Sequence, residues 1–120
     1  MPSFIKNLTF DCEDALRVAR FWAAALVSDV DEKSTSERAY VEAPGWGGPN
    51  IWFRGGRGPK SAPNRVHVDL RALTSMGEEV ERLIALGATD AAGPIGRFRW
   101  CQGCRCSSRR SQRHHLTCRS

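Results

Sequence analysis

The sequence predicts an α+β fold built from two βαβββ units. The first observation behind this is an internal echo. Lys6–Cys12 and, about sixty residues later, Arg65–Leu70 both alternate apolar and polar side chains and both lead into an amphipathic helix. The second observation is length, because 120 residues suffice for one core but are few for two independent domains. We therefore expect one domain made of two halves, with one sheet face against a helix and the other free for polar groups.

The first unit is expected to begin with a strand over residues 4–10, with Asp11 capping the helix that follows. That helix runs to about residue 26, and its buried stripe recurs at helical spacing: Ala15, Val18, Ala19, Trp22 and Leu26. Three short strands follow, around Val30, at 38–43 and at 50–54, and they are separated by polar or Gly/Pro-rich turns.

A linker is predicted over residues 55–63, which carry Gly and Pro and no large apolar side chain. The second unit starts with a strand at 66–70. Ser75 and Glu78 then form a capping-box pattern for a helix that ends at Gly87. Short strands are expected at 88–92 and 98–100, so the two units cover about 4–54 and 64–100.

Composition indicates an ordinary globular chain, with 41% hydrophobic and 26% charged residues. The net charge of +5 lies entirely in residues 101–120, which hold five Arg and no acid. We expect this basic Cys/Arg/Ser-rich tail to be disordered. No apolar run approaches the roughly 20 residues that cross a bilayer, and Met1–Lys6 lacks a secretory leader pattern, so a cytoplasmic protein without membrane contact is expected.

Three segments carry a resemblance to a known family: Phe21-Trp22 late in the first helix, Asn64–Leu70, and Leu83–Thr89. Together with the paired units, they resemble the vicinal-oxygen-chelate superfamily of glyoxalases, bleomycin-resistance proteins and extradiol dioxygenases, and within it the small glyoxalase-like domains. The resemblance covers roughly residues 4–100. It implies a curled mixed sheet around a cup, and in metal-dependent members a divalent ion held by His or Glu side chains on the first and last strands of each unit.

The resemblance assigns His67 to a metal position, whereas the matching position of the first unit is Asn7. The strand at 50–54 has no acid or His, and the chain has no acid after residue 100. A metal site needs three or four protein donors, so a cofactor is not expected. The second unit also lacks the strand that closes the cup, and the abrupt onset of the tail suggests a shifted reading frame or a divergent end.

The expected function is noncovalent binding or sequestering of a planar or cationic small molecule. The ligand-binding residues predicted for it are Asn7, Trp52, His67, Asp69 and Trp100. Aromatic faces stack on planar ligands, but Trp52 and Trp100 can equally be packing residues, and His67 can be a strand histidine satisfied by Asp69. The alternative is a metal-dependent lyase of the glyoxalase type, which stoichiometric metal lost on His67→Ala would support.

The tail permits a third reading of function. Cys101, Cys104, His114 and Cys118 supply thiol and imidazole groups of the kind that bind zinc, and the neighbouring Arg residues could grip phosphates. Nucleic-acid binding through the tail is therefore a further alternative, tested by deletion of residues 101–120. A homodimer is also expected, because a partner chain could complete the open second unit.

Overall fold

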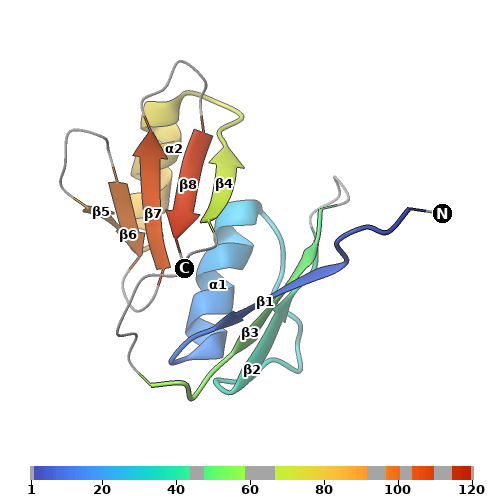
Figure 1. Ribbon diagram of the computed structural model, residues 1–120. Helices are drawn as coiled ribbons and strands as arrows, with labels where there is room; N and C mark the ends of the chain where they lie inside the picture. The colour runs from blue at the N-terminus through green and yellow to red at the C-terminus, as the bar shows by residue number, and fades with distance from the viewer. Residues whose placement is uncertain are drawn as a thin grey trace. The chain divides into compact units, whose positions relative to one another are not determined.

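The computed structural model describes residues 2–43, 48–58, 67–91, 97–100, 104–109 and 115–119, with the backbone alone for 67–69 and for the segments after Ala88. The chain divides into two compact units, Met1–Pro59 and Lys60–Ser120 (Figure 1). The division falls inside the predicted linker. Among the described residues, each unit has one helix and one sheet, which confirms the predicted α+β class.

The first unit contains a mixed three-stranded sheet. Its strands are β1 (Asn7–Asp11), β2 (Arg38–Val41) and β3 (Asn50–Arg54), in the order β1-β3-β2. The central strand β3 pairs parallel with β1 and antiparallel with β2. The strand expected around Val30 is a single bridge to Val41.

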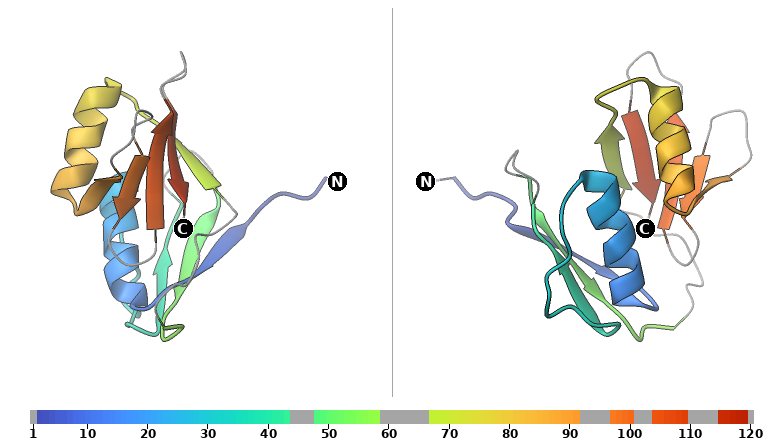
Figure 2. Two further views of the ribbon diagram at one scale, coloured as in Figure 1. Left: turned by 60° about the vertical axis from the view of Figure 1, so that its left-hand side comes forward. Right: turned by 180° about the vertical axis from the view of Figure 1, so that it is seen from behind.

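Helix α1 (Ala15–Leu26) covers one face of this sheet (Figure 2). Its buried side chains include Val18, Ala19 and Trp22, as the helical spacing predicts, and the strands contribute buried Val41 and Phe53. Alternate positions of the strands are therefore buried by the helix, which leaves the other positions on the opposite face. Burial of this apolar surface supplies the main stabilisation of the unit.

The prediction that Asp11 caps α1 is wrong. The cap is Asp14, whose Oδ1 accepts the backbone N–H of Arg17 at 3.1 Å. The strand β1 runs through Asp11, and Cys12 N still donates to Arg54 O at 2.8 Å. The turn into the helix therefore begins later than the sequence suggests, and Asp11 is the last residue of β1 instead of a helix cap.

The start of the predicted linker belongs to the first unit. Gly55 N donates to Glu37 O at 2.8 Å, and Gly56 N donates to Glu13 O at 2.9 Å. Gly56 and Gly58 have φ of +72° and +71°, a conformation that side chains other than glycine rarely adopt. Residues 55–58 are thus held against the start of α1 and the turn before β2 instead of forming a free connection.

The second unit contains a five-stranded antiparallel sheet in the order β4-β8-β7-β6-β5. Its strands are β4 (His67–Arg71), β5 (Ala88–Ala91), β6 (Arg97–Trp100), β7 (Cys104–Arg109) and β8 (His115–Arg119). Helix α2 (Met76–Ala85) lies along one face (Figure 2). The predicted capping box is confirmed, because Ser75 Oγ accepts from Glu78 N while the Glu78 carboxylate accepts from Ser75 N. Leu83 is fully buried, whereas Ile84 is 44% exposed.

The tail differs from its prediction. Disorder was expected over residues 101–120, but this segment supplies β7 and β8, which lie between β4 and β6. The physical reason is that strand pairing is made by backbone groups and does not require large apolar side chains. Two cysteines of these strands are in register with apolar residues of the neighbouring strands. Cys106 pairs with Phe98 and with Cys118, and Cys118 pairs with Val68.

Among the described residues, no helix has the length and apolar character that a membrane span requires.

Candidate functional site

The face of the β1-β3-β2 sheet opposite α1 gathers polar and aromatic side chains. We call it the outer face, and its residues are Asn7, Thr9, Asp11, Arg38, Tyr40, Asn50, Trp52 and Arg54. Each is exposed or half-buried, whereas the residues that alternate with them on β2 and β3 are buried. The alternation follows from strand geometry, in which successive side chains point to opposite faces.

An aromatic cluster occupies the β2–β3 part of the outer face. Tyr40 and Trp52 are register partners on neighbouring strands, and their ring centroids lie 4.5 Å apart at an interplanar angle of 47°. The guanidinium carbon of Arg38 lies 4.7 Å from the centroid of the Trp52 ring. A cation over an indole is attracted by the ring electrons and held in place. Trp52 is therefore a half-buried surface side chain with ordered neighbours.

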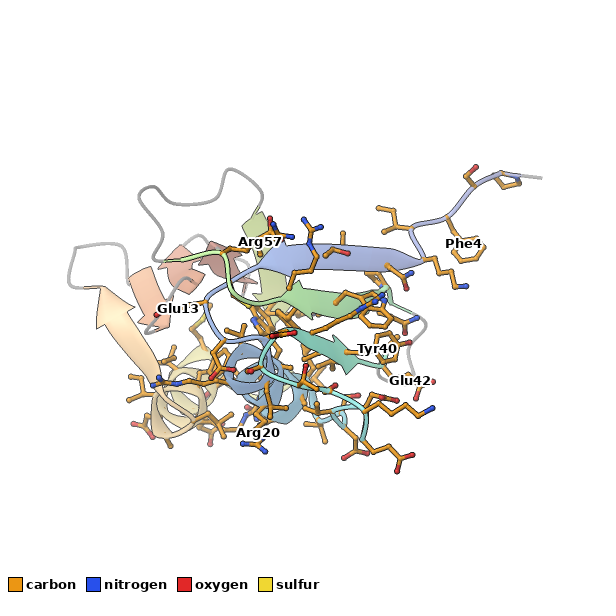
Figure 3. All side chains as sticks on the ribbon, turned by 90° about the horizontal axis from the view of Figure 1, so that it is seen from below. Phe4, Glu13, Arg20, Tyr40, Glu42 and Arg57 are labelled. Carbon is orange, nitrogen blue, oxygen red and sulfur yellow. The ribbon has the colours of Figure 1, made fainter. Side chains whose placement is uncertain are left out.

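The other end of the outer face concentrates arginines around one carboxylate. Arg54 Nε donates to Asp11 Oδ1 at 2.9 Å, and Arg57 Nε lies 3.9 Å from the same oxygen (Figure 3 labels Arg57). All three side chains are about half exposed, with exposed fractions of 50–53%. In addition, Arg38 is the direct cross-strand partner of Arg54. Three guanidinium groups thus share a region that holds the single carboxylate of the outer face.

Tyr40 lies close to carboxylates at the far end of β2. Partial burial raises the pKa of its phenol, and the negative charges of Glu42 and then Asp31 raise it further. Figure 3 shows Tyr40 and Glu42 at the same end of the strand. The outer face therefore has a polarity, from the arginines at one end to Glu42 at the other.

The first-unit position that the superfamily resemblance would assign to a metal does not suit one. Asn7 stands there, and its Oδ1 accepts a hydrogen bond from Asn50 Nδ2 at 3.3 Å. Asp11 is already held by Arg54 and Arg57, and two guanidinium groups repel a cation. Within the described part of the chain, no group of three or more His, Cys, Asp or Glu side chains could hold a metal ion. The donors of this unit do not fit a divalent ion.

The predicted site residues of the second unit are known by their backbone positions. His67 pairs in register with Arg119, and Asp69 with Thr117, on β4 and β8. Trp100 pairs with Cys104 on β6 and β7. Positions along a strand alternate between two series, and pairing across strands joins positions of the same series. Trp100 is in the same series as Val68, whereas His67 is in the other series. The side chains of His67, Asp69 and Trp100 lie outside the described structure, so their role in ligand binding stays a prediction.

Of the predicted residues, the structure therefore brings Asn7 and Trp52 to one face of one sheet. The site residues predicted from the sequence do not include Arg38, Tyr40 or Arg54. The signal for them is the alternation in Arg38-Ala39-Tyr40-Val41 and Asn50–Arg54, which places their side chains opposite the core. What sequence cannot supply is the register that sets Tyr40 beside Trp52 and Arg38 beside Arg54.

Comparison with known proteins agrees with this architecture. A glyoxalase-like domain matches residues 7–105, which is most of the chain and extends from the start of β1 into β7. No curated protein and no solved structure was found to match. The match covers both units and bears out the resemblance drawn from Phe21-Trp22, Asn64–Leu70 and Leu83–Thr89. The chain belongs to the glyoxalase-like domain family.

Proposed function

We propose that this protein binds a small planar molecule noncovalently, and that the outer face of the first unit contributes the binding surface. The observation that supports this is the Tyr40–Trp52 pair, a half-buried aromatic surface on the side of the sheet that α1 does not cover. Aromatic rings exposed in this way offer a planar ligand dispersion and stacking contacts, which amount to about 0.5–1.5 kcal/mol per ring pair beyond area burial.

The surrounding polar side chains are suited to orient such a ligand. Thr9 is the register partner of Trp52 on β1, Asn50 lies two residues before Trp52 on β3, and both are at least partly exposed. Asn50 is itself fixed, because its Oδ1 accepts from Ala43 N at 2.7 Å and its Nδ2 donates to Asn7. Ligand sites typically combine an apolar platform with a few ordered polar groups.

The proposal includes no metal or cofactor. It is supported by the chemistry of Asn7 and by the arginines around Asp11, which leave no free donor set on this face. Elemental analysis of purified protein tests this point. A stoichiometric divalent ion that is lost in a His67→Ala variant would replace the proposal with the metal-dependent lyase.

The binding proposal itself is tested by calorimetric titration of the full-length protein with naphthamide, a planar and uncharged probe. Trp52→Leu removes the aromatic surface, and we expect it to weaken binding about fivefold. Phe4→Leu is the matched control, because Phe4 is an aromatic side chain that is 83% exposed and lies outside the sheet (Figure 3). Equal affinities for the wild type and the Trp52→Leu variant would refute the proposal.

A homodimer and a cytoplasmic location complete the proposal as expectations from the sequence. The dimer is tested by sedimentation of the purified chain over a concentration series. A monomer at all concentrations would contradict it without affecting the assignment of the outer face.

A further inference from the structure

We infer that the planar ligand of the outer face is a carboxylate, and that Arg38 binds its charged group. This inference rests on the proposed function and specifies the ligand class. It departs from the sequence-based expectation of a planar or cationic ligand, because the cationic position over Trp52 is already occupied by Arg38.

The excess of positive charge at one end of the outer face supports the binding of an anion. Arg38 on β2 is directly opposite Arg54 on β3, and like charges at such cross-strand positions destabilise a sheet. Asp11 neutralises one of them through its 2.9 Å contact with Arg54, and it is shared with Arg57 at 3.9 Å. These three arginines share the one negative charge of Asp11, so the group carries an excess of two positive charges. A bound anion would relieve their repulsion.

The second argument is the geometry of Arg38. Its guanidinium is held over the Trp52 ring, and among the described residues no acidic side chain pairs with it. A guanidinium carries five N–H donors in a planar fork, and their spacing matches the two oxygens of a carboxylate. Because the ring already restricts the side chain, less entropy is lost when an anion binds.

The third argument is the polarity of the face. Glu42 and Asp31 raise the pKa of Tyr40 from the far end of β2, so an anion is repelled there. At the opposite end it meets Arg38, Arg54 and Arg57. A ligand with its carboxylate toward Arg38 and its ring on the Tyr40–Trp52 pair satisfies both ends. A cationic ligand would have to place its charge among the arginines or give up the aromatic surface.

The test compares three planar probes of similar size on the full-length protein: naphthoate, naphthamide and N-methylquinolinium. Charge-assisted hydrogen bonds contribute more than neutral ones, so naphthoate should bind about tenfold more tightly than naphthamide in low salt. Arg38→Gln should abolish this preference, which is measured as the ratio of the naphthoate and naphthamide affinities in the same variant. Arg20→Gln is the matched control, because Arg20 is an exposed arginine that points away from the sheet on α1 (Figure 3).

The outcomes separate this inference from the proposed function. Binding of naphthamide that depends on Trp52, together with no preference for naphthoate, would overturn the carboxylate inference alone. A preference for naphthoate that survives in Arg38→Gln, or that is lost equally in Arg20→Gln, would overturn the assignment to Arg38. Failure of all three probes to bind would overturn the proposed function itself. Tightest binding of N-methylquinolinium would replace the inference with a cation site.

Discussion

Substitution of Gly55 by alanine is expected to be the most damaging single-methyl change in the first unit. An added Cβ would overlap Ser36 O and would lie 3.0 Å from Ser36 C and 3.2 Å from Ala15 N. These are backbone atoms, so no flexible side chain can move aside. Ser36 O also accepts the N–H of Ala15 at 2.8 Å, which ties the turn before β2 to the first residue of α1.

The expected destabilisation follows from these contacts. Relief of the clash requires the backbone to shift, which typically costs about 1–3 kcal/mol, and loss of the Ser36–Ala15 hydrogen bond adds about 1 kcal/mol. We therefore expect Gly55→Ala to lower the free energy of unfolding by about 2–4 kcal/mol. The assay is urea denaturation, followed by tryptophan fluorescence and by far-ultraviolet circular dichroism. Because Arg54 and Arg57 flank this glycine, naphthoate binding should weaken as well.

The matched control is Gly56→Ala, one residue along the chain. Its φ is +72° and no atom lies within 4 Å of the added Cβ, so only the left-handed backbone opposes the substitution, at about 1 kcal/mol. If the urea midpoint of Gly55→Ala equals or exceeds the urea midpoint of Gly56→Ala, the close approach of residue 55 to Ser36 is wrong.

Three substitutions and one titration test individual features. Asp11→Asn removes an ion pair between half-exposed groups, so stability should fall by under about 1 kcal/mol while naphthoate affinity rises; a fall in affinity would contradict the charge argument. Val27→Gly should stabilise the protein by about 1 kcal/mol, because Val27 is 84% exposed and its φ of 53° strains a β-branched residue. Thermal unfolding measures this, and an unchanged melting temperature would contradict the backbone strain at Val27. Tyr40 is the sole tyrosine, so phenolate absorbance during an alkaline titration should report a pKa above its ordinary value, and a normal value would refute the burial and charge around it. Hydrogen bonds from Ser75 lower the pKa of the Glu78 carboxyl. The stabilisation that they give is present above the unfolded-state pKa of Glu78 and is lost as pH falls through the folded-state pKa. In Ser75→Ala the pKa of Glu78, followed by NMR, should rise, and no rise would contradict the capping box.

The helices and the first unit were predictable because their signals are local. The spacing of Val18, Ala19 and Trp22 gives the buried side of α1, and Ser75 with Glu78 gives the start of α2. The predicted cap, Asp11, lies three residues before the observed cap, Asp14, because the sequence does not show where β1 ends. Composition misled at residues 101–120, since strand pairing depends on backbone groups and not on hydrophobic content.

The site was predictable only in part, because a binding surface depends on neighbours that the sequence does not specify. Asn7 was predicted from strand alternation and from the family resemblance, and Trp52 from its aromatic side chain; both lie on the outer face. Arg38 and Arg54 acquire their meaning from register, since a shift by one residue would move every side chain of β2 to the other face. The combination of Asn7 and Trp52 with His67 and Asp69 in one cup spans both units and stays a prediction.

The cross-strand pair Arg38 and Arg54 places two like charges side by side on the outer face, which favours anion binding and does not stabilise the sheet. Like charges at directly opposed cross-strand positions repel each other and destabilise a sheet. Stacking on Trp52 and the bond to Asp11 draw the two guanidinium groups toward different partners, which reduces the cost enough for the fold to tolerate it. A core-facing position would not permit this arrangement, because desolvated like charges are far more expensive. The same repulsion that slightly weakens the free protein therefore favours an anion at Arg38, and raising the salt concentration should reduce naphthoate affinity while leaving naphthamide affinity nearly constant.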